Sequence, residues 1–149
     1  MKLLIPMAIV AASLTACAKS SVTPISANQV MISTSAAPAC GSAGAAQVAS
    51  RMAAVATLRQ GFDRYLIQDA RSENNVQVFN RPATGVTVYG NSAHLTGGGT
   101  SVFGSNDTNL LVLMLRRGDP GFAQGIDAKR TLGADWATLV KNGIRTCTD

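Results

Sequence analysis

Histidine, acidic residues and aromatic side chains are scarce in this sequence of 149 residues, which has 1 histidine, 8 Asp and Glu, and 5% Phe, Trp and Tyr. Nucleophilic catalysis needs a base beside the nucleophile. The only histidine, His94, lies in the glycine-rich stretch "GNSAHL", which is typical of a solvated loop. Neither "GNSAH" nor "GTSVFG" matches the Gly-x-Ser-x-Gly elbow of hydrolases. We therefore expect a protein that is not an enzyme and that carries no cofactor.

The few acidic residues offer no evident pair for glycoside hydrolysis. Nearly all of them stand at predicted turns or helix starts, where hydrogen bonds to the backbone account for them. The stretch "TGGGTS" lacks the lysine and the following helix of a phosphate-binding loop, so flexibility explains its glycines better. No Cys-x-x-Cys spacing indicates a metal site. The sequence thus predicts no catalytic, metal-binding or small-molecule site. The acidic residues are Asp63, Asp69, Glu73, Asp107, Asp119, Asp127, Asp135 and Asp149.

Basic residues outnumber acidic ones and give the chain a net charge of +5. They are scattered, with no run and no interleaved aromatic residues, so we expect no binding to nucleic acid. A solvated face, or weak attraction to anionic polymers of the cell envelope, explains them better.

The first sixteen residues, "MKLLIPMAIVAASLTA", have the three-part plan of a secretory signal. Lys2 supplies the positive charge, Leu3 to Leu14 form the apolar run, and small residues precede Cys17. The run is shorter than the roughly 20 apolar residues of a transmembrane helix. We therefore expect a signal peptide at 1–16. Two alternatives are an ordinary signal peptide cut near the same place, which leaves Cys17 for a disulfide, and a cytosolic protein with an apolar first helix.

Leu14, Thr15, Ala16 and Cys17 resemble the lipobox of bacterial lipoproteins. The resemblance implies cleavage before Cys17, a diacylglyceryl thioether on its thiol and, usually, acylation of the new amino terminus. Each buried lipid methylene contributes about 0.8 kcal/mol, and more than one acyl chain gives stable anchoring. Ala18 stands where enterobacterial lipoproteins that stay in the inner membrane carry an aspartate. The resemblance therefore implies an anchor in the outer membrane, with the protein facing the periplasm.

With Cys17 taken by lipid, Cys40 and Cys147 are the remaining cysteines, an even number in an oxidising compartment. A bridge between them would close a loop of about a hundred residues, for which the chain-entropy model gives roughly 4.7 kcal/mol of stabilisation. Two unpaired thiols or a metal site are weaker alternatives, because there is one histidine. We therefore predict a Cys40–Cys147 disulfide.

Residues 17–27 are rich in Ser, Thr and Ala and include Pro24, without periodicity, which predicts a lipidated tether. The rest of the chain, 28–149, is long enough for one modest domain. This domain begins with "NQVMIST", whose β-branched and apolar residues predict a strand over Gln29 to Thr34.

The clearest helix is predicted over Ala43 to Gln60, because apolar residues recur there at spacings of three and four. Ser42 stands where an N-cap is expected, and Gly61 supplies a stop. Abundant alanine would let this helix lie close to a sheet. The recurring residues are Val48, Met52, Val55, Leu58 and Phe62.

Several short strands are predicted after the helix. "DRYLIQDA", "NVQVFN" and "GVTVYG" are rich in strand-forming residues and are separated by turn residues. The segment 90–109 is rich in Gly, Ser, Thr and Asn, which predicts either a long flexible loop or a ragged hairpin. "LLVLMLRRG", which starts at Leu110, is a continuous apolar run typical of a central strand covered on both faces.

Two short helical stretches, "IDAKRTLG" and "DWATLVKNG", precede Cys147. Asp135 is a candidate cap and Gly143 a stop. The order of elements predicts an α+β fold, with one long helix packed on a small, mainly antiparallel sheet and a short helical C-terminal segment. A disulfide to Cys147 would hold that segment near the start of the long helix, where its short helices would not persist alone.

Two segments, "RQGFDRYLI" and "RRGDPGFAQGIDAKRTLGADW", resemble parts of small alphaproteobacterial envelope lipoproteins, as do "MISTSAAPACG" and the final Cys147. The resemblance implies this fold and location and brings no activity with it. Local structure also explains the motifs: Gly61 ends a helix, and Asp119 with Pro120 and Gly121 makes a tight turn.

These observations predict a lipid-anchored envelope protein with a structural or binding role, bound to the membrane through Cys17. An accessory or sensor subunit of an envelope complex is the alternative, with 90–109 or edge strands as its contact with a protein partner. A hydrolase of cell-wall or lipid substrates has less support.

Overall fold

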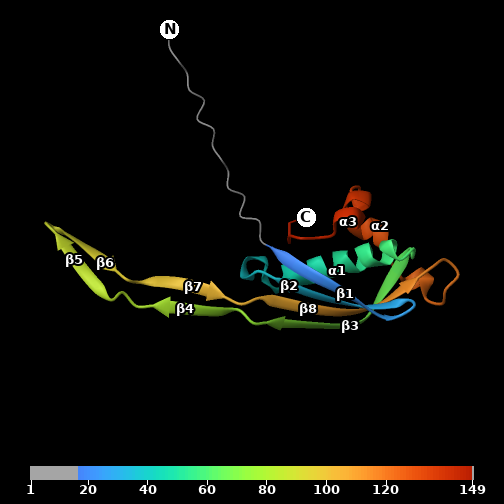
Figure 1. Ribbon diagram of the computed structural model, residues 1–149, viewed down its shortest axis with the longest axis horizontal. Coiled ribbons are helices and arrows are strands. Elements are labelled where there is room, and N and C mark those ends of the chain that lie inside the picture. The colour runs from blue at the N-terminus through green and yellow to red at the C-terminus, as the bar shows by residue number, and fades with distance from the viewer. Residues whose placement is uncertain (1–16, 149) are drawn as a thin grey trace, which may run out of the picture.

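The computed structural model describes residues 17–148, so the predicted signal peptide at 1–16 lies outside the described residues. It has the predicted α+β architecture: one long helix, a five-stranded antiparallel sheet and short C-terminal helices. A long two-stranded extension projects from one end of the sheet (Figure 1).

Five strands form the main sheet in the order β1-β2-β8-β3-β9, and every neighbouring pair is antiparallel. β8 contains the apolar run from Leu110 and lies in the centre, as predicted. Alternate residues of β2 and β8 are buried, because successive side chains of a strand point to opposite faces. The strands are β1 (Ala18–Ser26), β2 (Gln29–Ala36), β3 (Arg64–Asn74), β8 (Asn106–Leu115) and β9 (Ile126–Asp127).

The prediction of a tether at 17–27 is wrong, because Ala18–Ser26 form an edge strand that pairs with β2. The hydroxyl groups of Ser20 and Thr34 lie 2.7 Å apart across this pair. Pro24 stands beside a register shift, and edge strands tolerate its missing N–H. The composition is that of a linker, but the open edge of β2 supplies hydrogen-bond partners that the local sequence does not reveal.

The long helix α1 covers Gly41–Arg59, and it begins slightly earlier than predicted. Gly61 follows its end as predicted, with a φ of 77° that glycine adopts without strain. The prediction that Ser42 caps the helix is wrong. Its hydroxyl lies in the first turn and donates to Oδ1 of Asn106 at 3.1 Å, so it joins the helix to β8 instead.

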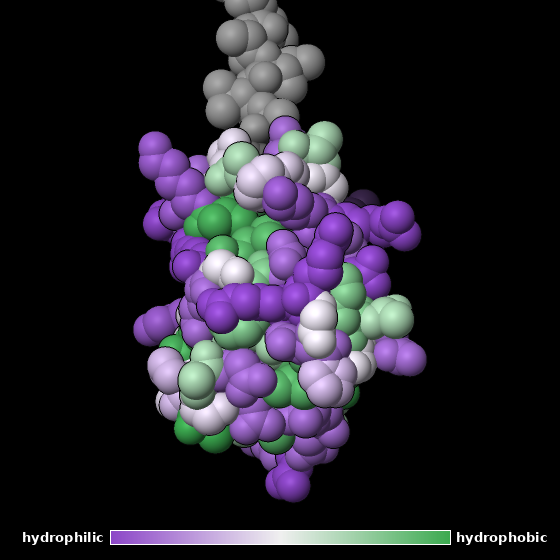
Figure 2. Space-filling model, turned by 90° about the vertical axis from the view of Figure 1, so that its right-hand side faces the viewer, coloured by the Kyte–Doolittle hydropathy of each residue, from purple (hydrophilic) through white to green (hydrophobic). Residues whose placement is uncertain are grey.

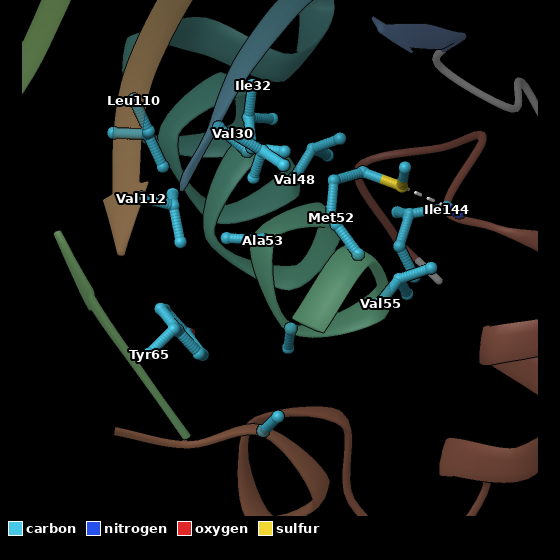
Figure 3. Packing of buried hydrophobic residues seen from close by; sticks show 14 of the residues in the cluster. Val30, Ile32, Val48, Met52, Ala53, Val55, Tyr65, Leu110, Val112 and Ile144 are labelled. Carbon is cyan, nitrogen blue, oxygen red and sulfur yellow. Dashed lines mark hydrogen bonds between the residues drawn. The ribbon is translucent and has the colours of Figure 1, made fainter. Parts of the chain in front are cut away.

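α1 packs across one face of the sheet, and this contact forms the main core (Figure 3). Buried alanines such as Ala49 and Ala53 keep the helix slender where it meets the strands. Tyr65 of β3 is fully buried, and its hydroxyl donates to the Ser50 carbonyl oxygen at 3.3 Å. The other core residues labelled in Figure 3 are Val30, Ile32, Val48, Met52, Val55, Leu110, Val112 and Ile144.

The short α-helices and the tail of the C-terminal segment pack against α1, whereas its 3-10 helix contacts β3 (Figure 1). The N–H of Ile144 donates to Sδ of Met52 at 3.4 Å within this second contact. The segment contains the 3-10 helix η2 (Phe122–Gln124) and the short helices α2 (Ala128–Leu132) and α3 (Trp136–Asn142).

The two short helices begin differently. The Asp127 carboxylate caps α2 by accepting a hydrogen bond from the Arg130 N–H at 2.9 Å. Asp135 occupies the N-cap position of α3, but its side chain makes no cap hydrogen bond, so this prediction holds for position only. Gly143 ends α3 as predicted, with a φ of 75°.

The prediction that β8 is covered on both faces is wrong. Alternate residues of β8 are buried beneath α1, whereas Leu111 and Leu113 stay partly exposed on the other face. Within residues 17–148, α2 and α3 pack against α1, and on the other face only the short 3-10 helix η2 contacts the end of β3, near Arg64 and Leu66. A continuous apolar run does not distinguish a fully buried strand from a half-buried one, because apolar residues also occur on surfaces.

Residues 75–105 form a two-stranded arm that continues β3 and β8 beyond the sheet (Figure 1). A two-residue turn closes its tip, with Gly90 at a φ of 59°. Residues 90–109 are therefore neither a flexible loop nor a hairpin by themselves: they form the tip and the returning half of the arm, followed by the start of β8. The arm contains two strand pairs, β4 (Gln77–Arg81) with β7 (Gly99–Phe103) and β5 (Gly85–Tyr89) with β6 (Ser92–Thr96).

Candidate functional site

Cys17, the predicted lipid-attachment residue, is exposed and is the first residue that the structure describes. Its carbonyl oxygen accepts a hydrogen bond from the Ala37 N–H at 3.0 Å, and it forms an antiparallel bridge with Thr146. The N–H of Ala18 donates to the Arg145 carbonyl oxygen at 2.8 Å. Backbone pairing thus extends to the predicted acylation site, and a lipid there would join the folded body without a spacer.

Cys40 and Cys147 form the predicted disulfide, with Cα atoms 5.9 Å apart and a sequence separation of 107. The bond joins the C-terminal tail to the N-cap position of α1. Gly44 leaves room for it, because a Cβ there would lie 3.1 Å from Cβ of Cys40 and 3.4 Å from that of Cys147. The tail residues just before Cys147 pair with the chain at Cys17. The disulfide therefore also holds the segment that borders the predicted lipid site.

Cys17 and the arm lie at the same end of the sheet. Ala18 is opposite Ala36 in the β1–β2 pair, and Ala36 is opposite Asn106 in the β2–β8 pair. Asn106 is in turn opposite Asn74, the last residue of β3 before the arm. A single row of paired residues therefore connects the chain just after Cys17 to the base of the arm.

Asp107 fastens the base of the arm to the sheet. The two arm strands meet where the Asn75 N–H donates to the Ser105 carbonyl oxygen at 2.9 Å. The Asn75 amide donates to Oδ2 of Asp107 at 2.8 Å, and the Ser105 hydroxyl donates to Oδ1 at 3.0 Å. A hydrogen bond from Ser35 of β2, then those from Asn75 and Ser105, hold the pKa of Asp107 below its ordinary value of 3.8, against the opposing effect of partial burial.

The uncovered face of the sheet carries a shallow polar depression of about 350 Å³ near Asp107. Serine and threonine side chains from β1 and β2 line it, together with Lys19 and Glu73. Small-molecule sites bury most of their ligand and are mainly apolar. This depression is open and would leave much of a ligand exposed, so it does not have the character of such a site.

The arm exposes large apolar side chains on both of its faces. Val78 and Val102 lie opposite each other on one face, and Phe79 and Phe103 lie on the other with ring centroids 6.4 Å apart, edge to face. Among the described residues, six of the nine exposed large apolar side chains belong to the arm. At the opposite end of the molecule, hydrophilic residues surround the apolar ones (Figure 2). Contiguous exposed apolar surface of this kind marks interaction sites.

His94 lies in a strand rather than in the predicted loop. It is exposed in β6, opposite Thr87 of β5. Residues 75–105 contain no Asp or Glu, so the arm itself offers no carboxylate partner. Elsewhere in residues 17–148, no group of three or more His, Cys, Asp or Glu is placed to hold a metal ion. No helix in that range is long and apolar enough to cross a membrane.

Comparison with protein-family models, with curated proteins and with solved structures finds no match for this chain. Membership of an envelope lipoprotein family therefore stays a prediction from the sequence motifs.

The sequence offers 90–109 as a contact surface but does not predict the whole arm, although a signal for the arm is present. "YGNS" places Gly-Asn as a two-residue loop between strand-like runs, which is a strong hairpin signal. The glycine and serine content of the segment favoured flexibility instead. The sequence does not reveal that β3 and β8 continue into one ribbon, because their pairing is long-range.

Proposed function

We propose that this chain is a lipid-anchored lipoprotein of the cell envelope, which faces the periplasm from the outer membrane and has a structural or binding role without catalysis. The observation that carries the proposal is Cys17, which ends the lipobox-like sequence Leu-Thr-Ala-Cys and stands exposed where the folded body begins. The disulfide between Cys40 and Cys147 supports an oxidising compartment.

Labelling of cells with radioactive palmitate tests the anchor. Cys17→Ser should abolish incorporation of label, because the acyl chains depend on this thiol. Cys147→Ser is the matched control and should keep the label. Persistent labelling of Cys17→Ser would contradict the proposal, and separation of inner from outer membranes tests the predicted location.

The exposed apolar arm favours a second candidate function, an accessory or sensor subunit of an envelope complex. Apolar patches such as Val78 with Val102 support a binding role, since contiguous exposed apolar surface marks interaction sites. A cross-linked pull-down from envelopes separates the candidates. Reproducible recovery of one complex supports a subunit, and recovery of this chain without a partner protein supports a standalone structural role.

A hydrolase of cell-wall or lipid substrates has the least support. Its best general base, His94, is exposed on the arm without an acidic residue in the same segment. Any hydrolysis by the purified protein should persist in His94→Ala. Loss of activity in that variant would favour the hydrolase instead.

A further inference from the structure

The arm is a two-stranded ribbon with both edges open. β4 and β5 form one edge and β6 and β7 form the other, and neither edge pairs with a further strand within residues 17–148. A single hairpin is marginally stable in water by itself. Unpaired N–H and C=O groups along its edges are a template for another strand.

Other open edges of the molecule carry more protective residues within their strands than the arm does. Natural edge strands avoid unwanted pairing with charged side chains and proline. β1 has Lys19 and Pro24, and the outer edge of β3 beyond its short pairing with β9 has three charged residues. Residues 75–105 have a single charged residue, Arg81, and a single proline, Pro82, which lies in the break between β4 and β5 and not within a strand. The three charged residues of β3 are Asp69, Arg71 and Glu73.

We propose that the arm is an assembly element that pairs edge to edge with the arm of a second copy of this chain. This inference rests on the binding role proposed for the arm. The near absence of charge leaves little repulsion between two arms, and it offers no charge pattern that would select a different, charged partner. Both edges are uncovered over the same length, so an edge strand of one arm can pair with the open edge of another.

The interruption in the arm also favours an identical partner. The ladder stops at 82–84 on one strand and at 97–98 on the other, and the two breaks face each other, with the Cβ position of Gly98 3.5 Å from Cβ of Ala83. An arm of the same sequence has its break at the same distance from the tip. Two arms side by side can therefore pair both in the β4–β7 part and in the β5–β6 part. A straight strand would pair with only one of these two parts.

Pairing would cover the flanks of the exposed apolar side chains. Directly opposed residues of paired antiparallel strands have Cβ atoms about 4.5–5.5 Å apart. Phe79 and Val88, which are 59% and 64% exposed, would each gain neighbours from the second copy. Anchoring at Cys17 would also hold neighbouring arms at one height above the membrane, which raises their effective concentration.

Photo-cross-linking of the full-length chain in cells tests this proposal. The photoreactive amino acid p-benzoylphenylalanine replaces Phe79 or, as a matched control, Ile25, which is 54% exposed on β1. Position 79 should yield species that contain two differently tagged copies of this chain, identified by mass spectrometry, and position 25 should not. Cross-links from position 79 only to another protein, only to lipid, or to nothing would overturn the proposal.

A charge variant provides the second measurement. With the photoreactive residue at Val88, Phe79→Lys should cause loss of the cross-link between copies, and Ile25→Lys should retain it. Alkylation without reductant should find the Cys40–Cys147 disulfide intact in both variants, which shows that the body is folded. An unchanged cross-link in Phe79→Lys would overturn the proposal. Palmitate labelling of the same samples scores the anchor separately, so failure of one inference is not mistaken for failure of the other.

Discussion

Asp107 is the residue through which pH acts on the base of the arm. Hydrogen bonds, that from Ser35 above all, hold its pKa below 3.8. A carboxylate with a depressed pKa stabilises the folded state above its unfolded-state pKa, and this contribution is lost as the pH falls through the folded-state value. Stability should therefore decline below about pH 4. Asp107→Asn should flatten that decline, as measured by denaturant unfolding at stepped pH.

The cause of the depressed pKa can be tested by removing its largest contributor. In Ser35→Ala the carboxylate loses a donor that favours its charged form, so the pKa of Asp107 should rise towards 3.8. Titration of the Asp107 carboxyl carbon by NMR measures this shift. A wild-type Asp107 that titrates at or above 3.8 would contradict the role given to these hydrogen bonds.

Gly44 is a residue whose small size the disulfide requires. Gly44→Val should destabilise the fold by about 1–3 kcal/mol, because branched methyl groups would crowd a Cβ position that already lies 3.1 Å from Cβ of Cys40. Ala43→Val, at an exposed neighbouring position, controls for the lower helix propensity of valine. Equal losses in the two variants, measured by denaturant unfolding, would show that the space beside the disulfide is not limiting.

At the scale of elements, the sequence predicted what local periodicity determines. α1 and the central position of β8 were predicted because their apolar residues recur over many positions. β1 was missed because its residues become a strand only through the edge of β2. The first half of the arm was predicted as strands, but 90–109 was left open between loop and hairpin because glycine-rich strands give a weak pattern and their pairing depends on the turn at Gly90.

The base of the arm depends on a second glycine. Gly104 has a φ of 103°, and a Cβ there would overlap the Asn75 carbonyl oxygen. Gly104→Ala should therefore separate the two strands at Asn75 and Ser105 and speed hydrogen exchange of the arm amides. The global unfolding free energy should change by less than about 0.5 kcal/mol, because the arm lies outside the core.

Gly99→Ala is the matched control for the arm. Gly99 also lies in the arm, but an added Cβ would meet no atom within 4 Å. Its arm amides should keep the exchange rates of the wild type. Faster exchange in both variants alike would mean that the close approach at Gly104 is not what holds the strands together.

At the scale of the whole molecule, Cys17, the tail at Thr146 and the base of the arm meet at one end of the sheet. Counting the cysteines was enough to predict the Cys40–Cys147 bond, because only one intramolecular pair remains once Cys17 is assigned to lipid. The sequence does not predict that Cys17 lies near the base of the arm, because this depends on the strand registers that place Ala18, Ala36 and Asn106 in one row. The predicted lipid site thus adjoins the base of the arm, and the disulfide holds the tail beside it.

This arrangement predicts that anchoring and stability separate between two cysteine variants. Cys147→Ser removes a cross-link between residues separated by 107 positions. Loss of such a native disulfide from a small secreted domain typically costs about 2–5 kcal/mol, which is a large share of a usual total of about 5–15 kcal/mol. Cys147→Ser should therefore unfold at much lower denaturant concentration and still incorporate palmitate. Cys17→Ser should lose palmitate with its unfolding midpoint unchanged, because serine keeps the backbone groups that pair with Thr146 and Ala37. A midpoint that falls as far in Cys17→Ser as in Cys147→Ser would instead make Cys17 a structural residue of the body.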